Sequence, residues 1–284
     1  MNIYQFYRLR SAIFLILSLL LPFNLVAKDS LTLGIHPFLA DEVLIKKFSP
    51  LAKYLNSQTG LNIIIKVGSS YDEHIHYAGS DKLDIAYMGP ASYIHMVNKY
   101  GNKPILAKLE VKGISYFQGN IIARKESGIK SLEDLVGKRI AFGDPNSTMS
   151  YIVPHHVMHQ AGVFKNNTTE HQFLHSHNNV ALAVLSGDFD AGAVKPAVFQ
   201  KFKDKGLRTI AVTPKISEHL FITRVDLPEK TIAILRSAML NITDTALGVS
   251  TLKKIKNSIT NLVEARQEDY TNLRKIILES QELH

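Results

Sequence analysis

Strand-like and helix-like segments alternate along almost the whole chain, and this alternation constrains the fold more than any other feature. Leu31–Ile35, Asn62–Val67 and Leu83–Met88 are short strand-like runs, and a helical pattern follows the first and the third of them. The helical pattern after the first run ends at Gly60. From Pro228 onward the pattern is helical almost to the end. The alternation predicts an α/β protein with mainly parallel sheets and a C-terminal helical segment.

The stretch Lys138–Tyr151 combines a short apolar strand, an Asp-Pro turn and a helix start rich in hydroxyl groups. A helix start leaves about four backbone N–H groups without internal partners and has a partial positive charge. Ser147 is placed as the N-cap, with Thr148 and Ser150 beside the free amides. Such a corner suits an oxyanion without requiring a Lys or Arg. A Ser147 that only caps its own helix fits the same pattern.

The N-terminus has the composition of a secretory signal peptide. Arg8 and Arg10 precede an apolar run over residues 12–22, and Ala27 is a small residue at a plausible cleavage point. The run is too short to span a bilayer comfortably, so we expect cleavage near Ala27 and export to the periplasm. Retention as an N-terminal anchor is the alternative. The chain has no cysteine, which excludes disulfides, thiolate metal sites and a lipid-anchored precursor.

The charge balance is basic but does not point to nucleic acid. Without residues 1–27, the chain keeps 31 of its 33 lysines and arginines against 25 acidic residues. The lysines are spread along the sequence, and the tightest cluster, Lys253, Lys254 and Lys256, has no interleaved aromatic residues. We therefore expect no nucleic-acid partner, and interpret the cluster as a solvated helix face.

No motif in the sequence indicates catalysis or a resident cofactor. The chain lacks a Gly-x-Ser-x-Gly elbow, a Walker A loop, a dinucleotide fingerprint and a His-Glu-x-x-His pair. His155 and His159 are four residues apart and could share one helix face, but no acidic residue accompanies them. Packing or solvation explains them better than a metal ion. The sequence predicts a protein that is not an enzyme and has no cofactor and no metal site.

Short motifs follow one another in an order that resembles one protein family. The motifs are Gly34–Pro37, Pro50–Leu55, Tyr71–Asp72, Asp84–Tyr93, Ser127–Lys138, Phe142–Thr148, Ser176–Gly187 and Asp190–Val194. In this order the chain resembles the periplasmic phosphate/phosphite/phosphonate-binding proteins of ABC importers, over nearly all of the sequence after residue 27. The resemblance implies a two-lobed, type II periplasmic-binding-protein-like fold with a ligand held in the cleft between the lobes.

The resemblance also implies a set of ligand contacts. These contacts are Tyr71, Tyr116, Ser147, Thr148, Met149, Ser150 and His177. The family's anion motif is altered here, because Met149 replaces its second serine and Ser150 replaces its glycine. Tyr71 and Tyr116 would be aromatic donors, although a tyrosine near a strand end is often only half-buried packing. His177 would be the cleft histidine, with helix capping as the alternative.

Two extended runs, Ile114–Arg124 and Leu220–Thr223, bracket a self-contained strand–helix unit. After the signal peptide at residues 1–27, we expect lobe 1 over residues 28–122 and lobe 2 over residues 123–220. The chain would return to lobe 1 over residues 221–284 with its C-terminal helices. The partners implied are a small oxyanion and an ABC permease in the inner membrane, and the chain itself would be a monomer or a weak homodimer.

The same resemblance bears on the choice of ligand. Relatives that prefer an aminoalkyl phosphonate place carboxylates near its ammonium group. Here Val194–Ala197 contains no acid, and Ser217–His219 offers only Glu218, which does not align cleanly. A buried ammonium without a counter-charge is costly, so we expect an inorganic or unaminated phosphorus oxyanion. Delivery of that ligand to an ABC importer is the predicted function, and a periplasmic sensor for a membrane signalling protein is the alternative.

Overall fold

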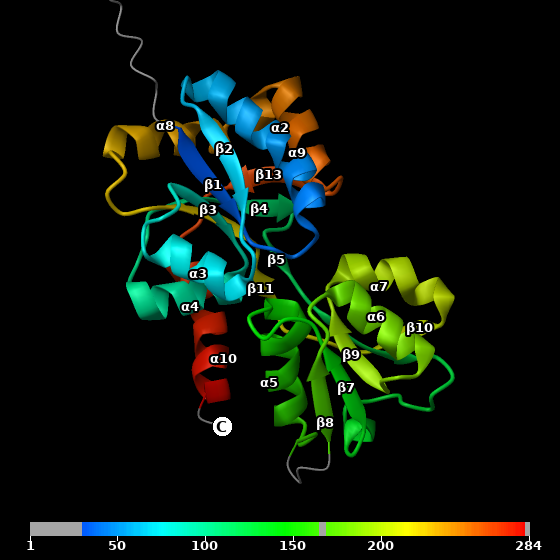
Figure 1. Ribbon diagram of the computed structural model, residues 1–284. Helices are drawn as coiled ribbons and strands as arrows, with labels where there is room; N and C mark the ends of the chain where they lie inside the picture. The colour runs from blue at the N-terminus through cyan, green and yellow to red at the C-terminus, as the bar shows by residue number, and fades with distance from the viewer. Residues whose placement is uncertain (1–29, 165–168, 282–284) are drawn as a thin grey trace, which may run out of the picture.

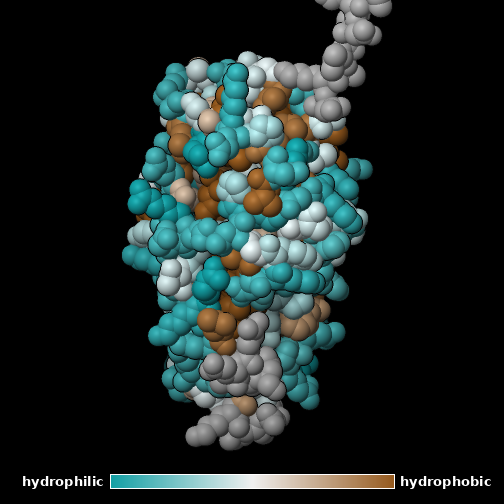
Figure 2. All heavy atoms as spheres, turned by 90° about the vertical axis from the view of Figure 1, so that its left-hand side faces the viewer, coloured by the Kyte–Doolittle hydropathy of each residue, from teal (hydrophilic) through white to brown (hydrophobic). Residues whose placement is uncertain are grey.

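The computed structural model describes residues 30–164 and 169–281, and Figure 1 shows them as two sheets flanked by helices. The expected signal peptide lies outside the described residues. None of the helices within the described ranges is long and apolar enough to cross a bilayer. The face in Figure 2 is covered mainly by hydrophilic side chains, since most apolar residues pack against the sheets.

The first sheet has six strands in the order β13-β4-β12-β3-β1-β2. Their bounds are β1 Leu31–Ile35, β2 Ile63–Val67, β3 Ile85–Met88, β4 Ile105–Val111, β12 Leu220–Thr223 and β13 Ile259–Val263. Helices cover both faces: α2 Asp41–Thr59, α8 Glu229–Leu240 and α9 Ala246–Ile255 on one, α3 Tyr71–Gly79 and α4 Pro90–Tyr100 on the other. A hydrophobic core lies on each face of this sheet, and successive residues of β3 point to opposite cores. Ile85 and Tyr87 face one core, and Ala86 and Met88 face the other.

The second sheet has five strands in the order β10-β6-β9-β7-β8. Their bounds are β6 Asn120–Arg124, β7 Arg139–Phe142, β8 Glu170–Phe173, β9 Ala191–Val194 and β10 Leu207–Val212. One face packs on α5 (Val153–Gln160), and the other on α6 (His177–Ser186) and α7 (Pro196–Phe202). The fully buried Phe142 fills the first of these cores. Four short 3₁₀ segments also occur in the described residues: Glu133–Leu135, Lys203–Lys205, Ile242–Asp244 and Gln267–Tyr270.

The chain passes twice between the sheets, and the two passages pair with each other. The first contains β5 (Tyr116–Phe117) and the second β11 (Ile216–Ser217), joined as an antiparallel pair. The C-terminal helix α10 (Thr271–Gln281) contacts both α4 and α5, so it touches helices of both sheets. All of β6 belongs to the second sheet and all of β12 to the first. The boundaries expected at 122/123 and 220/221 therefore fall inside strands.

Two expectations about the sheets need correction. Both sheets are mixed rather than mainly parallel, because the strands that follow each passage return antiparallel to their neighbours, as β12 does against β3 and β4. The segment after Pro228 is also not helical throughout, since β13 forms an edge strand against β4. Ile259 and Leu262 of β13 are buried, and this strand is too short for its pattern to be distinguished from a helical one.

Candidate functional site

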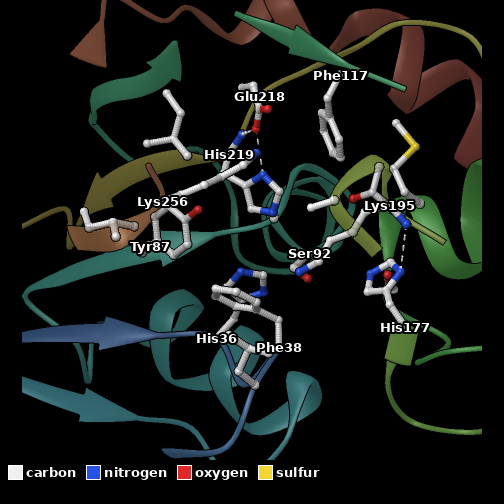
Figure 3. Close-up of a pocket in the computed structure, with 18 of the residues that line it drawn as sticks. His36, Phe38, Tyr87, Ser92, Phe117, His177, Lys195, Glu218, His219 and Lys256 are labelled. Atoms are coloured by element: carbon white, nitrogen blue, oxygen red, sulfur yellow. Dashed lines mark hydrogen bonds and ion pairs between the residues drawn. The ribbon is translucent and has the colours of Figure 1, made fainter. Parts of the chain in front are cut away.

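A cavity of about 220 Å³ lies between the two sheets. Its walls come from segments that follow strands: His36 and Phe38 after β1, Gly89 after β3, Ser147 after β7, and Lys195 after β9. Figure 3 shows labelled side chains from both sheets around it. Ligands of open α/β sheets bind at the carboxyl ends of the strands, so this is the expected place for a ligand.

The hydroxyl groups of the turn after β7 are held in position by backbone amides. Ser147 is the N-cap of a wide helical turn over Thr148–Ile152, and its Oγ accepts a hydrogen bond from Ser150 N at 3.2 Å. Thr148 Oγ1 accepts from Ala91 N, in the first turn of α4, at 3.0 Å. Since each oxygen already accepts a bond, each hydroxyl proton remains available to donate into the cavity. The predicted capping role of Ser147 is confirmed, and it is compatible with anion binding.

Five of the seven predicted contacts line the cavity: Tyr71, Ser147, Thr148, Met149 and His177. Ser150 does not, because its fully buried Oγ donates to Ala193 O at 2.8 Å. Tyr116 is 39% exposed beneath the ammonium group of Lys215, and its neighbour Phe117 lines the cavity instead. Successive residues of a strand face opposite sides, so a shift of one position exchanges a phenol for an apolar ring.

Two cavity residues that were not predicted carry buried polar atoms without partners. His36 is 2% exposed and Ser92 is 1% exposed. Neither ring nitrogen of His36 nor Ser92 Oγ has a hydrogen-bond partner within the described part of the chain. Burial, followed by the charges of neighbouring histidines and Lys195, holds the pKa of His36 well below its usual value. His36 is therefore neutral at pH 7 and offers one donor and one acceptor nitrogen.

The His177 ring has a defined tautomer. Its Nδ1 accepts a hydrogen bond from Lys195 N at 3.1 Å, and a backbone amide can only donate. Burial, and then the positive charges of Lys195 and His219, hold the pKa of His177 well below its usual value. The neutral ring must then carry its proton on Nε2, which makes Nε2 the donor available to a ligand.

Glu218, the only candidate acid in the two regions considered from the sequence, does face the cavity. Glu218 is 4% exposed and lines the cavity. Its Oε2 accepts from His219 N at 3.1 Å and contacts His219 Nδ1 at 3.0 Å (Figure 3). Burial alone would raise the pKa of Glu218, but its bonds with His219 and the charges of His219 and Lys256 outweigh burial and lower it. Glu218 is thus an ionised carboxylate that is already hydrogen-bonded to His219.

The histidines of α5 lie in packing contacts away from the cavity. The rings of His155 and His159 are 6.4 Å apart, and His155 stacks on Phe164 with centroids 4.7 Å apart. Within residues 30–164 and 169–281, no three His, Asp or Glu side chains are grouped so that they could hold a metal ion.

Buried histidines near the cavity make stability depend on pH. Burial lowers the pKa of His74 from 6.5 to about 4, although its bond to Tyr87 O works against this. Between these values the unfolded chain binds the proton and the folded chain does not, so stability falls as the pH falls from 6.5. We expect His74 to account for about 3 kcal/mol of the free energy of unfolding lost by pH 4.

Urea unfolding of the wild type and of His74→Gln at pH 7 and pH 4.5 measures this contribution. Glutamine keeps a donor for Tyr87 O and does not titrate. The variant should lose less stability between the two pH values than the wild type. Equal losses in both proteins would contradict the assignment.

Comparison with known proteins gives a consistent result. The sequence model of the family described as "ABC transporter, phosphonate, periplasmic substrate-binding protein" matches residues 33–270. The chain is 30% identical over 189 residues to the phosphate-import protein PhnD of Mycolicibacterium smegmatis, covering 63% of this chain and 59% of that protein. It is 25% identical over 264 residues to the probable ABC transporter phosphite binding protein PhnD1 of Prochlorococcus marinus, covering 87% and 88%.

Solved structures show the same fold. The structure of Prochlorococcus marinus PhnD1 in complex with methylphosphonate superposes with a TM-score of 0.79 at 22% identity, covering 89% of this chain and 99% of that one. A binding protein component of an ABC phosphonate transporter from Pseudomonas aeruginosa gives 0.75 at 24% identity, with 89% and 87% covered. These likenesses establish the two-sheet α/β architecture of a type II periplasmic binding protein.

Proposed function

Since the chain belongs to the phosphonate family of periplasmic substrate-binding proteins of ABC transporters, we propose that it captures a phosphorus oxyanion in the cavity between its sheets. The chain spans about three fifths of the first relative's length, so its ligand and partners are proposals. One observation carries the proposal. The partnerless polar atoms of His36 and Ser92 share a buried cavity with the donor hydroxyls of Ser147 and Thr148.

These donors are neutral, which suits a tetrahedral oxyanion held by several hydrogen bonds. Hydrogen bonds to a charged group contribute about 1.5–3 kcal/mol each, and an unpaired buried donor costs about 1–3 kcal/mol. At His36 and Ser92, a bound anion would add the hydrogen-bond energy and would also remove the cost of the unpaired polar atoms. The acceptor nitrogen of a neutral His36 can also accept a hydrogen bond from a P–OH group. Sulfate is fully ionised at pH 7 and has no such proton, so the site favours phosphorus oxyanions.

We propose that the two sheets form the cores of two lobes that close on the ligand. Bonds that join the sheets border the cavity on one side: Thr148 Oγ1 with Ala91 N, and Asn146 Nδ2 with Asp72 Oδ1 at 2.9 Å. These contacts are those of a closed arrangement. Bending of the two chain segments that contain β5 and β11 would move the lobes apart and admit the ligand. We further propose export to the periplasm after cleavage near Ala27, and delivery of the ligand to an ABC permease of the inner membrane.

A thermal-shift screen tests the proposed function. The panel contains phosphate, phosphite, hypophosphite, methylphosphonate, 2-aminoethylphosphonate, arsenate and sulfate. A ligand at a thousand times its Kd stabilises the native state by about 4 kcal/mol, which corresponds to a rise in melting temperature of about 8–16 °C for a protein of this size. We expect such a rise with at least one phosphorus oxyanion and none with sulfate. No rise with any phosphorus compound would refute the proposal.

A further inference from the structure

The charged groups of the cavity are mostly positive. Three lysines line it, namely Lys47 from α2, Lys195 at the start of α7 and Lys256 after α9. Among the described residues that line it, Glu218 is the only carboxylate, and it forms two contacts with His219. Counted without the histidines, the three lysines and Glu218 sum to two positive charges around the cavity.

The ammonium group of Lys195 lies against an aromatic ring. Its Nζ lies 4.7 Å from the centroid of the Phe38 ring, and no carboxylate forms an ion pair with it in the described ranges. Lys47 differs, because its Nζ donates to Ile255 O at 2.9 Å. Burial first, and then the charges of Lys256 and Lys47, lower the pKa of Lys195 to about 8, although the charge of Glu218 acts in the opposite direction. Lys195 is still mainly protonated at pH 7, and an anion beside it would relieve an unpaired charge.

The cavity has room for more than one tetrahedral anion. Its volume of about 220 Å³ compares with about 30 Å³ for one water molecule in the liquid. Apolar side chains, among them Phe38, Leu109 and Phe117, line the rest of it. The Phe38 ring neighbours His36, with centroids 4.9 Å apart, and also the Lys195 ammonium. A short hydrocarbon chain along Phe38 could therefore join a group at His36 to a group at Lys195.

We propose that the preferred ligand is a short organophosphonate with a second anionic group, such as a carboxylate, that pairs with Lys195. This inference rests on the proposed function, because it assigns the phosphonate end to Ser147, Thr148 and His36. It narrows the expectation of an inorganic or unaminated phosphorus oxyanion to one that has a second anionic group. A cationic tail would meet Lys195 and Lys256, while Glu218 is already engaged by His219.

Two ligands of matched size test the inference by titration calorimetry at pH 7. One is 3-phosphonopropionate, and the other is propylphosphonate, in which a methyl group replaces the carboxylate. A charge-assisted pair in a partly buried site should make 3-phosphonopropionate bind at least about tenfold more tightly. We also expect 2-aminoethylphosphonate to bind at least about tenfold more weakly than ethylphosphonate.

The Lys195→Met variant tests whether Lys195 causes the preference for 3-phosphonopropionate. Methionine keeps the apolar stem of the side chain and removes its charge. The ratio of the two affinities should fall below about threefold in this variant. Lys253→Met, on the exposed side of α9, is the matched control and should leave the ratio unchanged. An unchanged ratio in Lys195→Met, or equal affinities in the wild type, would overturn the inference.

The outcomes also separate this inference from the proposed function. If propylphosphonate binds but 3-phosphonopropionate binds no more tightly, the proposed pairing of a second anionic group with Lys195 is refuted and the proposed function is not. If no phosphonate binds, the proposed function itself fails. Tighter binding of 2-aminoethylphosphonate than of ethylphosphonate would also overturn the inference. Glu218 would then pair with the ammonium tail of the ligand and no longer with His219.

Discussion

Replacing Ser147 and Thr148 together with alanine should weaken binding of the phosphorus oxyanion by about 100-fold or more. Both hydroxyl oxygens accept backbone N–H bonds, so their protons are oriented to donate to the ligand. Two hydrogen bonds to a charged group, each worth about 1.5–3 kcal/mol, account for a loss of this size even if water replaces part of it. Titration calorimetry with the best ligand of the thermal-shift screen measures the effect.

Loss of the Ser147 cap should also lower the free energy of unfolding by about 1 kcal/mol, so the experiment needs a control for stability. Thr245→Ala provides it, because Thr245 caps α9 in the same way, accepting from Gly248 N at 3.0 Å, and does not line the cavity. This control should lose similar stability and keep its affinity. A double variant with unchanged affinity would show that these hydroxyl groups do not hold the ligand.

Replacing His36 with phenylalanine and Ser92 with alanine should have opposite effects on binding and on stability. Their polar atoms are buried without partners, at a cost of about 1–3 kcal/mol for each group. Removing them should raise the free energy of unfolding of the ligand-free protein by about 1 kcal/mol or more. The same change removes donors to the ligand, so affinity should fall by about 100-fold or more.

Urea unfolding without ligand and calorimetry with ligand measure the two effects separately. The Ser92→Ala variant alone introduces no larger side chain, and it serves as the second test if phenylalanine at residue 36 disturbs the aromatic contacts with Tyr71 and Tyr87. A ligand-free Ser92→Ala protein that is less stable, or one that binds as tightly as the wild type, would contradict this account of the cavity.

The sequence predicted the parts of the site that depend on local pattern. The strand, turn and hydroxyl residues around Ser147 lie next to one another in the chain, so one short segment carries the signal. Neither His36 nor Ser92 was singled out, although each lies in a motif that was recognised. Burial without a partner depends on neighbours far away in sequence: the ring of His36 lies 5.5 Å from that of His219. Only the folded chain brings such residues together.

The remaining differences also have long-range causes. Whether Tyr116 or Phe117 faces the cavity depends on the pairing of β5 with β11, about a hundred residues later in the chain. The direction of β12 depends on its passage from the second sheet, which no local pattern of Leu220–Thr223 specifies. Glu218 was set aside because it did not align with acids of relatives, yet its bond with His219, the next residue, keeps it at the cavity.

A crystal structure of the protein grown with methylphosphonate tests the central claim most directly. We predict that the phosphonate oxygens lie within about 3.2 Å of Ser147 Oγ, Thr148 Oγ1 and His177 Nε2. The same oxygens should satisfy Ser92 Oγ and a ring nitrogen of His36, the atoms that otherwise have no partner in the described chain. A phosphonate bound outside the cavity between the sheets, or a cavity without phosphonate at a concentration that saturates the protein in calorimetry, would contradict the account.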